Sequence, residues 1–177
     1  MNPGFILRTA QAVMAPVSPA DLADLQALKA DPRVFATMLG GVRSPPQAAA
    51  ELATDLTFWA ARGVGIWTVR DAAGGAFLGI AGLMERPDGL GIALRFAFWP
   101  EARGRGLARA AAGAALRFAH ERAGIARVVA VAREDNIASR MVLGAIGMTE
   151  RGAFLRGGQR MLIYASERAI PGSDGCK

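Results

Sequence analysis

The chain has 177 residues, of which 52% are hydrophobic, and its formal net charge is +6 at pH 7. This length predicts one domain with a sizeable core, and the apolar content argues against disorder. No apolar run reaches the roughly 18 residues of a membrane span, no signal peptide is evident, and one His with one Cys, Cys176, cannot supply a metal-ligand cluster. We therefore expect a single-domain cytoplasmic protein that uses no metal and contacts no membrane.

The first half of the chain predicts one strand and two helices. Residues 6–14 are expected to form the strand, and a helix should begin at Pro19-Ala20-Asp21, after which leucines recur three residues apart. Ser44 precedes two prolines and should cap a second helix, because its hydroxyl can accept hydrogen bonds from the free amides of the first turn. This helix should end at Gly63–Gly65 and bury one apolar face formed by Leu52, Leu56 and Trp59.

The second half alternates strands and helices. Strands are expected at residues 66–70, 77–83, 90–98, 128–132, 149–154 and 161–165, and helices at 106–122 and 137–145. The passage from residue 90 to residue 132 runs strand, helix, strand, so its two strands should be parallel, whereas the flanking hairpins should be antiparallel. The expected fold is an α/β domain with a mixed, mostly antiparallel sheet flanked by helices. It should span residues 1–177, with a core at about 8–165 and a flexible tail at 166–177.

The loop at residues 98–108, of sequence FWPEARGRGLA, is the most informative stretch. It leads from an apolar strand directly into an Ala-rich helix, so it places free backbone N–H groups at a helix N-terminus, where a diphosphate binds well. Gly104 and Gly106 permit the tight turn, and Arg103 and Arg105 add attraction for phosphate. The P-loop and the dinucleotide fingerprint are both absent, because no Lys follows a Gly and the third Gly of the fingerprint is missing.

The positive charge is concentrated around this loop. Residues 95–140 hold nine Arg against four acidic residues, a net charge of +5, which leaves only +1 for the rest of the chain. Such a patch would attract a coenzyme that carries a diphosphate and a 3′-phosphate. An Arg-rich composition with a solvated helix face would give the same pattern. Basic and aromatic residues do not alternate as in a platform for bases, so nucleic acid is not an expected partner.

Two blocks resemble the motifs of the GCN5-related N-acetyltransferase (GNAT) superfamily. The spacing Arg103-x-x-Gly106-x-Ala108 is similar to its acetyl-CoA-binding motif, and residues 136–148 resemble its later Asn-x-x-Ser…Leu-Gly block, with Met148 where Phe is usual. Residues 65–70 and 77–83 resemble the branch of ribosomal-protein N-terminal acetyltransferases (RimJ/RimL-like). The resemblance covers residues 8–165 or so, and it implies that the two central parallel strands splay apart to admit the pantetheine arm of the coenzyme.

The resemblance assigns coenzyme contacts to both blocks. The backbones of Phe96 and Phe98 should contact the pantetheine and the thioester, and a main-chain N–H of this strand should steady the oxyanion. The side chain of Asn136 should hydrogen-bond the pantetheine amides, although an N-terminal helix cap alone would explain an Asn there. The implied coenzyme-binding residues are Phe96, Phe98, Arg103, Gly104, Arg105, Gly106, Leu107, Ala108, Asn136, Ser139 and Arg140.

The acid and the base of the reaction are less well determined. Many family members use a Tyr seven residues after the Asn to protonate the leaving thiolate, but Leu143 stands here. Ser139 is the remaining local acid, and a thiol with a pKa of about 8.5 also departs with little help. Glu85 is the candidate general base, whereas Glu101 and Glu150 are alternatives that a solvated surface position would explain.

The leading interpretation is an acetyl-CoA-dependent N-acetyltransferase that acts by direct attack in a ternary complex. Its acceptor would be a primary amine on a protein N-terminus, a lysine or a small molecule. The alternative is a non-catalytic acyl-CoA-binding or sensor domain on the same fold, which the missing Tyr keeps open. The sequence leaves the oligomeric state undecided, a homodimer included.

Overall fold

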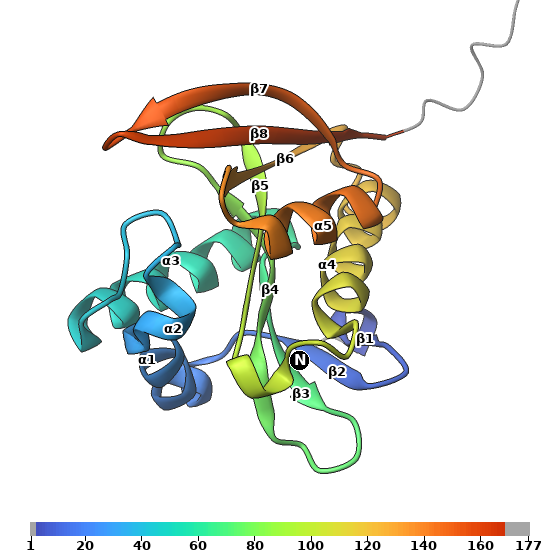
Figure 1. Cartoon of the computed structure of the whole chain (residues 1–177). Helices are drawn as coiled ribbons and strands as arrows, with labels where there is room; N and C mark the ends of the chain where they lie inside the picture. The colour runs from blue at the N-terminus through green and yellow to red at the C-terminus, as the bar shows by residue number, and fades with distance from the viewer. Residues whose placement is uncertain (1–2, 169–177) are drawn as a thin grey trace, which may run out of the picture.

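The chain forms one mixed sheet of eight strands in the computed structural model, which describes residues 3–168 (Figure 1). The strands stand in the order β1-β2-β3-β4-β5-β6-β8-β7, and all neighbours are antiparallel except β5 and β6. They are β1 (Leu7–Arg8), β2 (Ala12–Pro16), β3 (Ile66–Asp71), β4 (Phe77–Glu85), β5 (Ile92–Phe98), β6 (Arg127–Arg133), β7 (Thr149–Arg156) and β8 (Gln159–Glu167). The predicted α/β class with a mostly antiparallel sheet is confirmed.

Helices cover both sides of the central strands. The α-helices of the described residues are α1 (Leu22–Ala30), α2 (Pro32–Phe35), α3 (Pro45–Arg62), α4 (Leu107–Arg117) and α5 (Ile137–Ala145). In Figure 1, α1–α3 gather on one side of β4 and β5, whereas α4 and α5 lie on the other. A 3₁₀ turn, η3 (Pro100–Ala102), precedes α4, and a π-helical segment, η4 (Phe118–Arg122), continues it. Within the described part of the chain, no helix is long and apolar enough to cross a membrane.

Local chemistry sets the ends of α3, as the sequence predicted. The Ser44 hydroxyl accepts a hydrogen bond from the Gln47 N–H at 3.4 Å, and the Gln47 side chain accepts one from the Ser44 N–H at 2.9 Å. This reciprocal capping satisfies two amides that would otherwise be free. At the other end Gly63 adopts φ +64°, a left-handed conformation that suits glycine and stops the helix.

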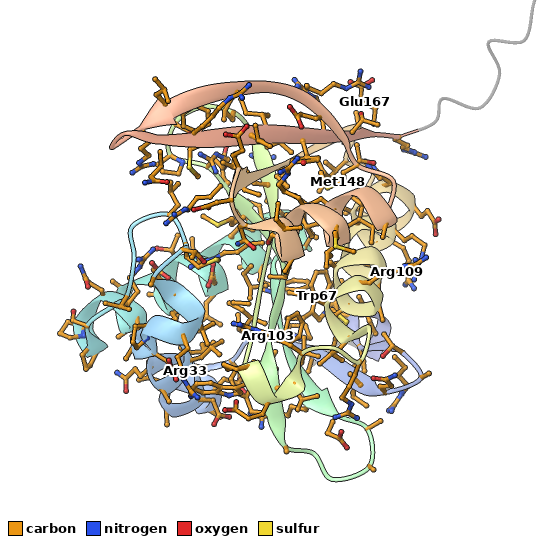
Figure 2. The ribbon with its side chains drawn as sticks, viewed as in Figure 1. Arg33, Trp67, Arg103, Arg109, Met148 and Glu167 are labelled. Atoms are coloured by element: carbon orange, nitrogen blue, oxygen red, sulfur yellow. The ribbon has the colours of Figure 1, made fainter. Side chains whose placement is uncertain are left out.

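An aromatic cluster fixes α3 and α4 against the sheet. The rings of Trp59 and Trp67 pack edge to face at 4.7 Å, and Phe118 packs on Trp67 at 5.2 Å. Phe5, from the N-terminal segment, contacts both Trp59 and Phe118. Trp67 is fully buried near the middle of the molecule (Figure 2). Because edge-to-face aromatic pairs favour one relative orientation, this cluster holds the C-terminal end of α4, where Phe118 lies, against β3.

Several predicted boundaries differ from the structure. The single strand expected at residues 6–14 is a hairpin of β1 and β2, because the Thr9 hydroxyl accepts from the Ala12 N–H at 3.0 Å and turns the chain. The helix expected at 106–122 changes to π-helical geometry at Phe118. β8 continues to Glu167, so the tail begins later than residue 166, and the rest of the predicted tail, 169–177, lies outside the described residues.

β5 and β6 part soon after they meet. They pair in parallel, as predicted, but their register contains only the pair Ala93 and Val129. By contrast, seven residue pairs join β4 to β5 and seven join β6 to β8. The edge of β5 that faces β6 therefore has no strand neighbour from Leu94 to Phe98, and its backbone is open to a ligand.

Candidate active site

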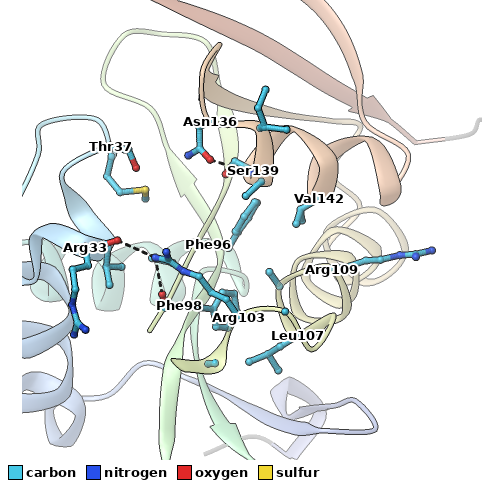
Figure 3. Close-up of a pocket in the computed structure, with 18 of the residues that line it drawn as sticks. Arg33, Thr37, Phe96, Phe98, Arg103, Leu107, Arg109, Asn136, Ser139 and Val142 are labelled. Carbon is cyan, nitrogen blue, oxygen red and sulfur yellow. Dashed lines mark hydrogen bonds between the residues drawn. The ribbon is translucent and has the colours of Figure 1, made fainter. Parts of the chain in front are cut away.

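A groove of about 630 Å³ opens where β5 and β6 part (Figure 3). We call it the loop groove, because the loop between β5 and α4 forms one wall. The end of β5, the start of α5 and α2 form the other walls. Its lining includes Arg33, Thr37, Met38, Phe96, Phe98, Arg103, Gly104, Gly106, Leu107, Ala108, Arg109, Asn136, Ile137, Ser139 and Val142.

Free amides face this groove at the N-terminus of α4. The N–H groups of residues 104–108 donate to no backbone carbonyl in the described part of the chain, whereas the Arg103 N–H donates to the Pro100 carbonyl at 3.1 Å. Gly104 and Gly106 adopt φ +78° and +71°, where any other residue would be strained. Free amides at the positive end of a helix are a site for an anion such as a diphosphate. Arg103 is one of the implied coenzyme-binding residues, but its amide is already used within the loop and does not belong to this set.

The arginines of the loop differ in what they do. Arg103 donates through Nη2 to the carbonyl oxygens of Arg33 at 3.1 Å and Phe98 at 3.3 Å, so its side chain ties the loop to α2 (Figure 3). Arg105 does not line the groove, and its guanidinium lies 3.9 Å from the Asp71 carboxylate. Arg109 lines the groove with its inner part, while its side chain extends away from it.

Asn136 caps α5 and also reaches the groove. Its Oδ1 accepts a hydrogen bond from the Ser139 N–H at 3.1 Å, so the capping role is confirmed. Its amide nitrogen has no partner among residues 3–168 and stays free to donate into the groove. The Ser139 hydroxyl likewise makes no hydrogen bond in the described structure.

Two residues of the second block lie outside the groove. Arg140 donates to the Glu134 carbonyl at 2.8 Å and to the Tyr164 hydroxyl at 3.3 Å, which holds its side chain against β8. Leu143, at the position where many family members carry Tyr, is 1% exposed and belongs to the hydrophobic core. Position 143 therefore offers no proton donor to the groove.

A second cavity, of about 920 Å³, adjoins the loop groove. We call it the α3 cavity, because α3 lines it together with the ends of β4 and β6 and the β7–β8 hairpin. The two cavities share four lining residues, which are Thr37, Met38, Phe96 and Ser139. Two molecules that enter from the two cavities can therefore meet beside Phe96 and Ser139.

Charged side chains of the α3 cavity form a cluster that sequence reasoning missed. Burial opposes ionisation of Glu51, but Arg95, Lys29 and Arg43 outweigh it and lower the pKa of Glu51 to about 2. Asp55, one turn further along α3, is half-buried and accepts no hydrogen bond in residues 3–168, and burial raises its pKa to about 6 against the pull of Lys29 and Arg95. The i, i+4 spacing of the two acids on α3 was the one signal in the sequence.

Glu85, the predicted base, lines the same cavity at its rim. Its side chain is 59% exposed, and its carboxylate lies 3.7 Å from the Arg62 guanidinium. The structure thus brings Glu85 into the cavity that adjoins Ser139 but leaves it solvated and paired with a cation.

The splayed parallel strands, with free amides at a helix N-terminus beside the opening, define the class of the protein as an acyl-coenzyme-dependent acyltransferase of α/β fold. Residues 12–149 match the family model of the acetyltransferase (GNAT) domain, and the chain belongs to this family. It is therefore an acyltransferase, as the sequence predicted. No curated protein matches the chain.

Solved structures agree with this assignment. An acetyltransferase from Agrobacterium tumefaciens is 26% identical with a TM-score of 0.81, covering 92% of this chain and 94% of that one. A protein from Bordetella pertussis assigned to the GNAT family is 25% identical with a TM-score of 0.80, covering 93% and 99%. RimL, a ribosomal L7/L12 alpha-N-protein acetyltransferase solved with coenzyme A, has a TM-score of 0.75 at 16% identity, covering 92% and 98%. RimL shares the fold, so the predicted likeness to the RimJ/RimL-like branch is confirmed at that level.

Proposed function

We propose that the chain is an N-acetyltransferase that moves the acetyl group of acetyl-CoA to a primary amine by direct attack in a ternary complex. The observation that carries this proposal is the junction of the two cavities at Phe96 and Ser139. A coenzyme in the loop groove would present its thioester there, and an amine in the α3 cavity would face it. Holding both reactants at one point supplies much of the rate in such a reaction.

The loop groove suits acetyl-CoA in three parts. The diphosphate would accept hydrogen bonds from the free amides of residues 104–108. The pantetheine arm would lie along the open edge of β5, where the backbone of Phe96 and Phe98 can pair with its amides. The free amide nitrogen of Asn136 can donate to the same arm.

The reaction needs a proton acceptor and a donor. The amine nitrogen forms a bond to the thioester carbonyl carbon, a main-chain N–H of β5 stabilises the oxyanion, and the C–S bond then breaks to release the thiolate. The Ser139 hydroxyl is the local group that can protonate the sulfur, and solvent can replace it. Glu85 and Asp55 can receive the proton of the amine, and the half-buried position of Asp55 favours it over the solvated Glu85.

One observation favours a non-catalytic alternative. Because Leu143 is buried in the core, the Tyr that many family members use has no counterpart here. A sensor domain would bind acetyl-CoA in the same groove but would release no thiol with any amine. Thiol release measured against a panel of amines separates the two functions.

The loop assignment is tested by two matched glycine variants. Gly106→Trp adds a side chain at the N-terminus of α4, and we expect at least about 10-fold weaker acetyl-CoA binding by calorimetry, because each lost charge-assisted hydrogen bond is worth roughly 1.5–3 kcal/mol. Gly63→Trp places the same residue at a similar φ, +64° against +71°, at a position that does not line the loop groove. It should fold equally well and keep normal affinity. Unchanged affinity in a folded Gly106→Trp protein would remove the diphosphate from this loop.

A further inference from the structure

Arg95 of β5 lines the α3 cavity, and its ion pair with Glu51 is a long one. Its side chain is only 14% exposed, and the nearest carboxylate oxygen, Oε2 of Glu51, lies 3.6 Å away. Within residues 3–168, its side chain makes a weak hydrogen bond from Nη1 to the Met84 sulfur at 3.8 Å. Glu51 is occupied elsewhere, since it accepts from Lys29 Nζ at 2.6 Å and from Arg43 Nε.

Among the described residues no fully buried side-chain nitrogen lacks a partner, so the N–H groups of Arg95 that are not paired within the protein face the cavity and can donate to a ligand. The ring of Phe35 lies 5.3 Å from the guanidinium carbon and stabilises the charge through its face. That contact does not occupy the N–H edge. A carboxylate from a ligand would match the edge in charge and in its two-pronged geometry.

The remaining charges of the cavity indicate what else the ligand carries. The lining includes six arginines and three carboxylates, and only Arg86 and Arg133 are neutralised by aspartates of their own turns, Asp88 and Asp135. The positive excess that remains disfavours a polyamine. Asp55, however, brings a carboxyl without a hydrogen-bond partner into the same cavity, close enough to Arg95 for the two charges to interact. A ligand with one anionic and one cationic group fits both residues.

We propose that the acceptor is a small amino carboxylate, whose carboxylate binds the Arg95 guanidinium while its amine lies between Asp55 and the cavity junction. This inference rests on the proposed acetyl transfer. Arg95 directly precedes Phe96 on β5, and both residues line the α3 cavity. A carboxylate bound to Arg95 would therefore hold the ligand close to Phe96, where the thioester is proposed to lie. Arg95 is thus a specificity-determining residue for the acceptor.

The decisive experiment compares amines that differ only in the carboxylate. Amino carboxylates of α, β, γ and aromatic types are each paired with their primary amides, and spermidine and a short peptide amide serve as further arms. With acetyl-CoA and the wild-type protein, we expect kcat/KM for the preferred acid to exceed that of its amide about 10- to 100-fold, the effect of hydrogen bonds to a charged group. Equal rates, or a preference for the amide, spermidine or the peptide, would overturn the inference and leave acetyl transfer intact.

Substitution of Arg95 tests whether this residue is the origin of the preference for the carboxylate. Arg95→Gln should lower the ratio of kcat/KM for the acid to kcat/KM for its amide to about 1, while the acetyl-CoA affinity stays unchanged. The ratio is the readout, because removing Arg95 also raises the pKa of Asp55 and alters the rate with both amines. Arg62→Gln removes the same charge from the same lining and should keep the preference. If Arg62→Gln abolishes the preference and Arg95→Gln does not, Arg95 is not the anchor.

Binding measurements distinguish a failure of the proposed acetyl transfer from a failure of the proposed amino-carboxylate site. If acetyl-CoA binds but no amine releases thiol, the proposed function fails, and calorimetry of the same pairs with the coenzyme-A-loaded protein then decides the inference. Tighter binding of the acids supports an amino-carboxylate site, and equal binding overturns it. The substrate comparison uses the wild-type protein, so it stands even if Arg95→Gln fails to fold.

Discussion

At the scale of single residues, Asp55 and Glu85 line the same cavity but differ in their surroundings, since Asp55 is half-buried and Glu85 is solvated and paired with Arg62. A base that deprotonates an amine works best with a pKa near the working pH, and burial raises the pKa of Asp55 to about 6. We expect Asp55→Asn to lower kcat/KM about 100-fold and to remove the fall in kcat/KM below a pH of about 6, measured as a pH–rate profile. Glu85→Gln should keep both the rate and the profile. The reverse pattern would make Glu85 the base.

The stability of the same Asp55→Asn variant tests whether the pKa of Asp55 is raised. A carboxyl whose pKa is about 6 in the folded protein and about 3.8 when unfolded holds its proton more firmly in the folded state. The contribution of Asp55 to stability is therefore lost as the pH rises from about 4 to about 6. In urea unfolding at a series of pH values, Asp55→Asn should gain stability relative to the wild type over this window. A constant difference across the window would mean that the Asp55 pKa is not raised.

At the scale of elements, the loop between β5 and α4 is held by Arg103. Its guanidinium bridges the Arg33 and Phe98 carbonyls, so it orders the free amides before a ligand arrives. We expect Arg103→Ala to weaken acetyl-CoA binding about 3- to 10-fold, because binding must then order the loop as well. Hydrogen exchange of residues 104–108 in the coenzyme-free protein should be faster in this variant.

Arg105→Ala is the matched control for this prediction, since Arg105 lies outside the groove with only a long contact to Asp71. It should leave both affinity and hydrogen exchange close to the wild type. If Arg103→Ala weakens binding without faster exchange, Arg103 acts on the phosphate directly rather than through the loop.

Elements whose ends are marked by capping or terminating residues could be predicted from the sequence. Elements that depend on contacts between distant residues could not. The bounds of α5, 137–145, were predicted correctly because Asn136 caps one end and Gly147 follows the other. The split of residues 6–14 into a hairpin depends on a turn between Thr9 and Ala12, closed by a backbone hydrogen bond and by the Thr9 hydroxyl, which no periodicity reveals. The splay of β5 and β6 was expected only from the family resemblance.

The charged cluster of the α3 cavity shows the same limit for the site. Lys29 and Glu51 are 22 positions apart, and Arg95 joins them only when β5 packs beside α1 and α3. Each of these residues looks like an ordinary surface charge when the sequence is read locally. The loop groove, by contrast, is built from two contiguous blocks and could be read from their motifs.

At the scale of the whole molecule, the arrangement of the two cavities predicts the kinetic order of the proposed reaction. They share the lining residues Phe96 and Ser139 and otherwise have mostly separate walls, so coenzyme and amine have room to be bound together. We therefore expect initial-rate plots against acetyl-CoA and amine to give intersecting lines, and mass spectrometry to find no acetylated protein after incubation with acetyl-CoA alone. Ser139→Ala should slow turnover more than it weakens coenzyme affinity. The loss of turnover should be only several-fold, because solvent can protonate a thiolate whose conjugate acid has a pKa of about 8.5.

Parallel lines, an acetyl group on Ser139 and complete loss of activity in Ser139→Ala would instead indicate a covalent intermediate. The α3 cavity would then receive the amine only after coenzyme A had left, and simultaneous binding could not supply the rate. A direct check is to measure amine binding to the protein loaded with coenzyme A, which a ternary mechanism requires and which a ping-pong mechanism does not.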